Sequence, residues 1–485
     1  MSDWLQRRPG APVGRLFQSR LPGDGKRQGE TFLLWACFLV MAVGFILRLF
    51  EVHLTAYNVS KHDLGYIVGL DSDKIGSGHL GYIEYICKNR ALPDFKPTAR
   101  WSFYNPPFFH VCAALCLRFW IMLGIPEAQS WELVQYFPCL VIGAAVLGMY
   151  LILRELRIKG VPLLCAMTLL SFHPALTYQS LALNNDPLAL CLTVWAAWFA
   201  LRWFQKPRLS FIIGVALCVG LGMMTKLTVA LIAPPIALLF LYRFFKDKQW
   251  LPYLKQFGIF AVICCPLGLF WSVRNQWLYD IPMTYVQSLP KDYPQNISGF
   301  SLWERFGLPA FSDFLRVESS WDPASEVGFA DHNLWSQTLR TALFDDNALE
   351  LTGGWRQVAV VLLVLAMVLT LLYAVLALIG LFRAKDTHWA VRVFIGSAAF
   401  LLLANYVKFC YDYPMTCTIH FRYIIPCLPW GCAGVGLWWQ SVTGKETAGK
   451  RLPARVVLGV TLGLTVVFCA LSALLCLHGL PRVEA

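Results

Sequence analysis

The chain has 485 residues, of which 57% are hydrophobic and only 14% are charged. A soluble protein of this length would carry about a quarter charged residues, so the composition excludes an ordinary soluble enzyme. The formal net charge of +12 is compatible with a nucleic-acid partner or with a membrane topology signal, and the choice depends on where the basic residues lie.

Eleven apolar segments are long enough to cross a bilayer, which predicts an all-α polytopic membrane protein. The first segment follows a polar and basic N-terminus (1–31), so the transmembrane domain is expected over 32–485. The predicted spans are 32–50, 133–153, 161–180, 187–204, 209–225, 227–245, 256–276, 356–382, 391–407, 423–440 and 456–478. One more apolar run, "PPFFHVCAALCLRFWIML" (106–123), is ambiguous because it is short and opens with two prolines.

The basic residues resolve this ambiguity. If 106–123 lies on the outer face instead of crossing, one side of the membrane receives the N-terminus and every short basic connection. These connections are 154–160, 202–208, 243–255, 382–392 and 444–455. Together with 1–31 they hold 23 of the 41 Lys and Arg. This positive-inside pattern predicts a cytoplasmic N-terminus, an outer loop over 51–132 with membrane-parallel helices, and a small outer segment over 277–355. The positive charge is then a topology signal, and no nucleic-acid partner is expected.

The first outer loop is unusually rich in ionisable residues. The stretch "NVSKHDLGYIVGLDSDKIGSGHLGYIEYI" (58–86) carries Asp63, Asp71 and Asp73 just after the first span. A carboxylate at this position is able to deprotonate an acceptor hydroxyl or amine. Aspartates in a loop also serve simply to solvate it, and His79 and His110 nearby are expected to be structural.

Three more polar clusters are predicted on the same face, each at the end of an apolar span. They are "NNDP" (184–187), "TK" (225–226) and "RYIIPCLP" (422–429). Each has a structural alternative: Asp186 as a helix N-cap, Lys226 reaching lipid headgroups, and Arg422 with Tyr423 as an interfacial anchor. All of these clusters are predicted on the same side of the membrane. Because ionisable groups at membrane depth are costly and usually mark function, this shared location favours a common functional site.

These residue types suit one kind of chemistry. A carboxylate base activates an acceptor, while a lysine and an arginine hold a phosphate and stabilise it as a leaving group. This combination is typical of glycosyl transfer from a lipid-phosphate sugar. No cofactor is expected with certainty: a divalent cation is possible but not favoured, and no Cys/His spacing indicates a zinc site.

In their order along the chain and in their shared side of the membrane, these motifs resemble those of the GT-C superfamily of integral-membrane glycosyltransferases. The branch in question contains the protein O-mannosyltransferases and lipid A aminoarabinose transferases (glycosyltransferase family 39-like), and the likeness covers roughly residues 32–440. It rests on "HD" (62–63), "YNPPFFH" (104–110), "NNDP", "TK" and "RYIIPCLP". The resemblance implies a GT-C fold with membrane-parallel helices in the first outer loop.

The resemblance also implies roles for individual residues. Asp63 would be the catalytic base, although Asp71 and Asp73 are close enough to compete for that role. The remaining candidates divide between the two substrates. His62, Tyr104, Asn185 and Asp186 would shape the acceptor side, and Lys226, Arg422 and Tyr423 would bind the donor phosphate.

The sequence therefore predicts an inverting glycosyltransferase that works at the outer face of a membrane, with a bacterial plasma membrane favoured. It would pass a sugar from a polyprenyl-phosphate donor to a glycan, lipid or protein acceptor. Two alternatives stay open. A lipid-linked glycan flippase or transporter would place its polar groups near mid-membrane, usually within an internal repeat. A glycan polymerase or ligase would use a diphosphate donor.

Overall fold

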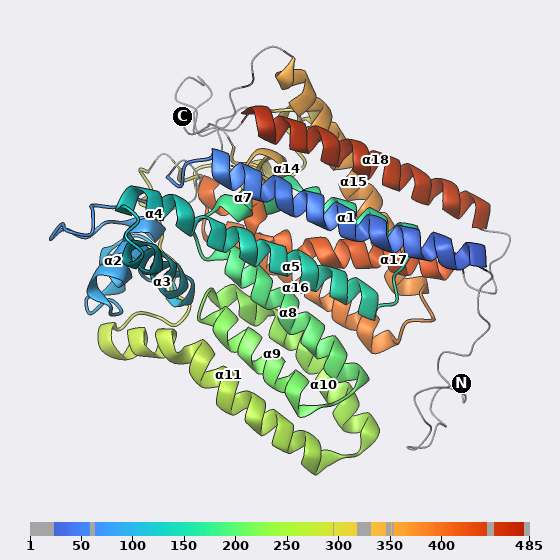
Figure 1. Ribbon diagram of the computed structural model, residues 1–485, viewed down its shortest axis with the longest axis horizontal. Coiled ribbons are helices and arrows are strands. Elements are labelled where there is room, and N and C mark those ends of the chain that lie inside the picture. The colour runs from blue at the N-terminus through green and yellow to red at the C-terminus, as the bar shows by residue number, and fades with distance from the viewer. Residues whose placement is uncertain are drawn as a thin grey trace.

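The structure is a computed structural model that describes residues 24–58, 64–293, 295–317, 331–345, 351, 354–443 and 451–479. Within these ranges the chain is helical, with two isolated β-bridges and no strand. Figure 1 shows a bundle of long helices with several short helices gathered near one end. The all-α membrane fold expected from the apolar runs is confirmed.

The long helices form the bundle and the short ones connect them. The helices of the long spans are α1 (Asp24–Leu54), α5 (Tyr136–Glu155), α8 (Asp186–Gln205), α10 (Ala233–Asp247, which makes a long span together with the turn before it), α11 (Trp250–Tyr279), α15 (Trp355–Arg383), α16 (Trp389–Asp412) and α18 (Arg451–Gly479). The shorter α-helices are α2 (Gly78–Asn89), α3 (Phe108–Met122), α4 (Glu127–Val134), α6 (Val161–Phe172), α7 (Pro174–Leu181), α9 (Leu209–Met223), α12 (Leu302–Phe306), α13 (Phe311–Phe314), α14 (Leu334–Phe344) and α17 (Leu428–Thr443). Short 3-10 turns are η2 (Pro97–Ala99), η3 (Leu227–Ile232), η4 (Thr416–Thr418), η5 (Phe421–Tyr423) and η6 (Ile425–Cys427).

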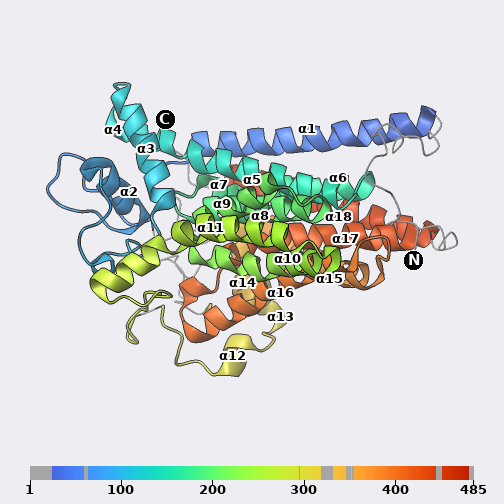
Figure 2. The same ribbon diagram turned by 90° about the horizontal axis from the view of Figure 1, so that it is seen from below.

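Each predicted span coincides with a helix or a helix pair. In the described part of the chain, eight segments are long and apolar enough to cross a membrane, and α6 with α7 makes a ninth if this bent pair counts as one span. The predicted spans 209–225 and 423–440 correspond to α9 and α17, which have only 15 and 16 residues. The ambiguous run 106–123 forms α3, also 15 residues long. Figure 2 shows α2, α3 and α4 together at one end of the bundle.

The basic connections gather at the opposite end of the bundle. Glu30, near the start of α1, pairs with Lys159 after α5 at 3.0 Å, and Glu155 pairs with Arg202 near the end of α8 at 2.9 Å. Gln440, near the end of α17, donates a hydrogen bond to a carbonyl in the connection after α5. In Figure 2 the start of α1 lies far from α2 and α3. The bundle therefore has a basic end and an end that carries the first loop.

The break between α6 and α7 has a clear covalent cause. Pro174 lacks an N–H, so the helical hydrogen-bond ladder is interrupted and the two helices bend by 41°. The carbonyl of Ser171, freed by the bend, accepts a hydrogen bond of 2.6 Å from Arg48 of α1, whose side chain is 1% exposed. Gly44, one turn earlier on α1, allows this close approach, because a Cβ there would lie 2.6 Å from the Ser171 oxygen. The bend directs α7 towards the end of the bundle that carries the first loop.

Candidate active site

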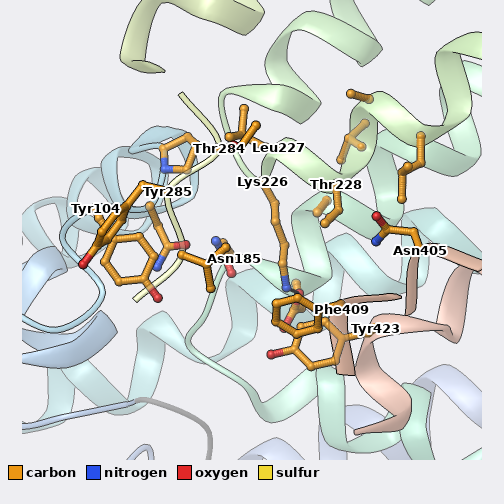
Figure 3. Close-up of a pocket in the computed structure, with 18 of the residues that line it drawn as sticks. Tyr104, Asn185, Lys226, Leu227, Thr228, Thr284, Tyr285, Asn405, Phe409 and Tyr423 are labelled. Carbon is orange, nitrogen blue, oxygen red and sulfur yellow. Dashed lines mark hydrogen bonds and ion pairs between the residues drawn. The ribbon is translucent and has the colours of Figure 1, made fainter. Parts of the chain in front are cut away.

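A cavity of about 560 Å³ lies where several helix ends meet near the first loop. Its walls come from the α7–α8 and α9–η3 junctions, the C-terminal halves of α11 and α16, and η5. Six of the eight predicted site residues line this cavity: Tyr104, Asn185, Asp186, Lys226, Arg422 and Tyr423. The other two, His62 and Asp63, lie outside the described residues. Figure 3 shows Lys226 reaching across the cavity towards Tyr423, with Tyr104 on the other side.

Asp186 lies in the first turn of α8, but its carboxylate does not cap the helix. The backbone N–H of Asp186 is held by the side chain of Asn184, at 3.0 Å, and Asn185 donates to the carbonyl of Thr225 at 3.1 Å. Pro187 follows as the second residue of the helix, in the first turn, where a missing N–H is tolerated. These contacts tie the α7–α8 junction to the end of α9 and leave the Asp186 carboxylate directed at two cations.

Lys226 and Arg422 are those two cations. Lys226 Nζ forms an ion pair with Asp186 Oδ1, and Arg422 Nε lies 3.9 Å from Asp186 Oδ2. Lys226 also lies over the ring of Tyr423, 4.8 Å from its centroid, and Arg422 donates to the Tyr423 hydroxyl at 2.9 Å. The Lys226 side chain is only 18% exposed. Lys226 is therefore part of a buried cluster and does not extend to lipid headgroups.

The charge and polarity of the cavity limit what it is able to bind. Among the described residues that line it, three are basic (Lys226, Lys408 and Arg422) and two are acidic (Asp186 and Asp412), with Lys408 paired to Asp412. This leaves one net positive charge. Many of the other lining residues are apolar: Leu190, Leu227, Val229, Leu231, Leu402, Ile425 and Pro426. The cavity therefore combines cationic and apolar side chains, which suits an amphiphile with an anionic head group.

Asp71 and Asp73 are exposed, and neither lines this cavity. Asp73 instead borders a separate hollow of about 210 Å³ beside α2. The first described residue after Asp63 is Leu64, whose carbonyl accepts a 2.8 Å hydrogen bond from the Leu80 N–H. The residue before Leu80 is His79, which lines the cavity. The chain next to Asp63 is thus anchored beside a cavity residue, whereas Asp71 and Asp73 are not in the cavity wall.

His79 and His110 form a buried stack beneath the cavity. Their rings are almost parallel, with His79 Nδ1 and His110 Nε2 2.8 Å apart, and Tyr82 stacks on His110 at 4.2 Å. Burial and the neighbouring His79 place the pKa of His110 well below its usual range, so this ring is neutral. In the described part of the chain no group of three or more His, Cys, Asp or Glu side chains is arranged to hold a metal ion. The stack is structural for His110, while His79 contributes to the cavity wall.

Sequence reasoning missed several cavity residues. Tyr285, after α11, makes an edge contact of 5.5 Å with Tyr104, and the Tyr104 carbonyl accepts from the Trp271 indole at 2.9 Å. Gln179 of α7 is 2% exposed and lines the cavity, and its Oε1 has no hydrogen-bond partner among the described residues. No motif marks Gln179, because its position depends on the bend at Pro174. A buried amide oxygen without a hydrogen-bond partner is unusual in a protein interior, and this one belongs to a residue of the cavity wall.

Comparisons with known proteins agree with the motifs. Residues 113–271, about a third of the chain, match the model of the dolichyl-phosphate-mannose-protein mannosyltransferase family. A comparison with curated protein sequences finds no match. The solved structures that resemble this chain include the oligosaccharyltransferase of Archaeoglobus fulgidus in a complex with Zn and sulfate. It is 13% identical with a TM-score of 0.47, over 92% of this chain and 54% of that one.

A second resemblance is to apo ArnT from Cupriavidus metallidurans, which is 16% identical with a TM-score of 0.35, over 84% of this chain and 77% of that one. This chain spans only about half the length of the archaeal enzyme. TM-scores below 0.5 do not establish a shared fold, so the assignment rests on the sequence match over 113–271 and on the motifs. That match confirms the resemblance seen in the sequence: this chain is an integral-membrane protein similar to the GT-C glycosyltransferases.

Proposed function

We propose that the protein transfers a sugar from a polyprenyl-phosphate carrier to an acceptor, with inversion at the anomeric carbon. The observation that carries this proposal is the cluster of Lys226, Asp186 and Arg422 in a cavity whose other walls are largely apolar. The matched family is described as using dolichyl-phosphate-mannose, a sugar on a polyprenyl phosphate. This description supports a lipid-phosphate donor for the present chain.

On the donor side, Lys226 and Arg422 would bind the phosphate. Asp186, which the sequence places on the acceptor side, would instead compete with the phosphate for these two cations. A sugar phosphodiester carries one negative charge, and Lys226 and Arg422 are the two cations that would bind it. Cations fixed in a site from which water is largely excluded stabilise a leaving phosphate strongly. The carbon–oxygen bond breaks towards the phosphate, so the carrier leaves as polyprenyl phosphate without an acid catalyst.

On the acceptor side, we assign Asp63 as the base that takes the proton of the attacking group. Asp186 is unsuited to this role, because two cations hold its carboxylate in the charged form and engage both of its oxygens. The anchoring of Leu64 beside His79 supports Asp63 over Asp71 and Asp73. Tyr104, Asn185 and His62 would shape the acceptor side. The acceptor attacks the face of the sugar opposite to the phosphate, which inverts the anomeric carbon.

We further propose that the cavity opens to the outer face of the membrane. The basic connections lie together at the opposite end of the bundle, and such connections are usually cytoplasmic. The N-terminus would then be cytoplasmic, with 51–132 and 277–355 outside. A bacterial plasma membrane is the proposed location, and the acceptor would be a glycan, a lipid or a protein.

The test is release of polyprenyl phosphate from a panel of polyprenyl-phosphate sugars in liposomes, with a membrane extract as acceptor. Asp63→Asn is compared with the matched control Asp71→Asn in the same loop. We expect release by the wild type and by Asp71→Asn, and none by Asp63→Asn. Equal release by Asp63→Asn would remove Asp63 as the base. No release from any donor by folded protein would favour a diphosphate donor or a transporter.

A further inference from the structure

Arg422 belongs to a short turn that the outer helix α14 holds in place. The turn η5 begins directly after His420, whose ring Nε2 lies 2.8 Å from Asp345 Oδ1 at the end of α14. The next residue, Phe421, donates its backbone N–H to Thr341 of α14 at 3.0 Å. Arg422 follows directly and points its guanidinium towards Asp186. Two hydrogen bonds to α14, one from the His420 ring and one from the Phe421 N–H, therefore hold the two residues that directly precede Arg422.

The hydrogen bonds of His420 define which ring nitrogen carries the proton. The backbone N–H of Arg422 donates to His420 Nδ1 at 3.0 Å, so this nitrogen must be unprotonated. The proton then lies on Nε2 and is donated to the Asp345 carboxylate. Asp345 thus selects the tautomer that accepts from the Arg422 backbone, in the way that a carboxylate orients a histidine in other sites. Without Asp345 the ring is free to adopt the other tautomer, in which Nδ1–H faces the Arg422 N–H.

The burial of Asp345 and His420 and the backbone conformation of Asp345 both show that the contact between these two residues is specific. Asp345 and His420 are each only 3% exposed, and Phe421 stacks on His173 at 5.4 Å with nearly parallel rings. Asp345 also has φ +58° and ψ −146°, a backbone conformation that favours glycine. An aspartate in such a conformation is strained, and the strain persists only where the surrounding structure maintains it.

We propose that Asp345 and His420 are positioning residues that hold Arg422 against the donor phosphate, so that α14 of the outer segment sets the affinity for the donor. This inference rests on the proposed role of Arg422 in phosphate binding. Neither residue touches the donor; both act through the Arg422 backbone. The outer segment is thereby connected to the cavity by a defined chain of hydrogen bonds from Asp345 through His420 to Arg422.

The test measures binding of a short-chain polyprenyl phosphate to detergent-solubilised protein, which needs no acceptor. Asp345→Gly removes the carboxylate and suits the backbone conformation, so the fold should be retained. Loss of a hydrogen bond to a charged group predicts roughly tenfold weaker binding. Asp345→Asn keeps an oxygen that accepts from Nε2 and should restore most of the affinity. His420→Phe provides an independent variant that keeps the volume of the ring.

A double-mutant cycle separates positioning from general destabilisation. In an Arg422→Gln background, Asp345→Gly should weaken binding no further, because its effect passes through Arg422. The control Asp247→Asn removes a carboxylate that pairs with Arg243 at the basic end, and should leave binding unchanged. Unchanged binding in both Asp345→Gly and His420→Phe, or additive losses with Arg422→Gln, would overturn the inference. If the wild type does not bind polyprenyl phosphate, the proposed function itself fails, and the inference fails with it.

Discussion

Two carboxylate–cation pairs, one at each end of the helix bundle, differ in how deeply they are buried. At the basic end, Glu30 and Lys159 are 58% and 67% exposed and lie on the surface. At the cavity end, Asp186 and Lys226 are 11% and 18% exposed, and Arg422 adds a second cation. An exposed pair contributes little to stability, whereas a buried cluster with one cation in excess retains the capacity to bind an anion. The difference fits our proposals that charge at the basic end sets the topology and that charge at the cavity end binds the donor phosphate.

The largest expected effect comes from Lys226→Met. This change leaves Asp186 with only the more distant Arg422 and removes one of the two proposed phosphate ligands, so release of the carrier should fall by about a hundredfold or more. Initial rates in liposomes at saturating acceptor provide the measurement. Lys159→Met is the matched control and should keep the wild-type rate. A comparable loss in both variants would mean that the two ends do not differ as described.

Gln179→Met should separate stability from activity. The Gln179 Oε1 atom is buried without a hydrogen-bond partner among the described residues. Replacing this amide with an apolar side chain of similar length should raise the thermal unfolding temperature of the ligand-free protein. We propose that the Gln179 amide contacts the donor in the cavity, so the same change should lower carrier release by about tenfold. Gln276→Met, on the exposed surface of α11, is the control. A lower unfolding temperature with full activity would show that Gln179 is an ordinary core residue.

Asp186→Asn tests whether the carboxylate competes with the phosphate for the two cations. Removing its charge raises the net charge of the described cavity residues by one. Polyprenyl phosphate should then bind roughly fivefold more tightly, and its release should become slower. Equilibrium binding and pre-steady-state release give the two quantities. Weaker binding would show that Asp186 chiefly holds the cations in position.

The smallest effect is expected at the basic end. Glu155→Gln keeps the side-chain volume and weakens an ion pair with Arg202, which is 36% exposed. The free energy of unfolding should change by less than about 1 kcal/mol, with carrier release unaffected. Denaturant titration and the liposome assay measure these quantities. A loss of activity here would place a functional role at the end that we assign to topology.

The helices and part of the cavity are predictable from the sequence because each is specified by residues that lie close together in the chain. Apolar runs specify α1, α15 and α18, and polar residues between such runs mark Asp186, Lys226 and Arg422 as helix-end groups. Because helix ends on one side of a bundle lie near one another, their convergence follows from topology.

Other features depend on tertiary contacts that no local pattern encodes. Asp345 reaches His420 across 75 residues of sequence, and Gln179 enters the cavity wall only because α6 and α7 bend at Pro174. The 15 and 16 residues of α9 and α17 are shorter than the predicted spans, since each apolar run continues into a turn that lines the cavity.

The contact between Arg48 and Ser171 has a consequence for how the protein is made. A ribosome synthesises α1 well before α6, and 123 residues separate the two partners. During that interval a lone α1 would carry an arginine that has not yet reached the Ser171 carbonyl, which is unfavourable in lipid. We therefore expect α1 to integrate stably only after α6 and α7 emerge, which makes its insertion dependent on a later part of the same chain.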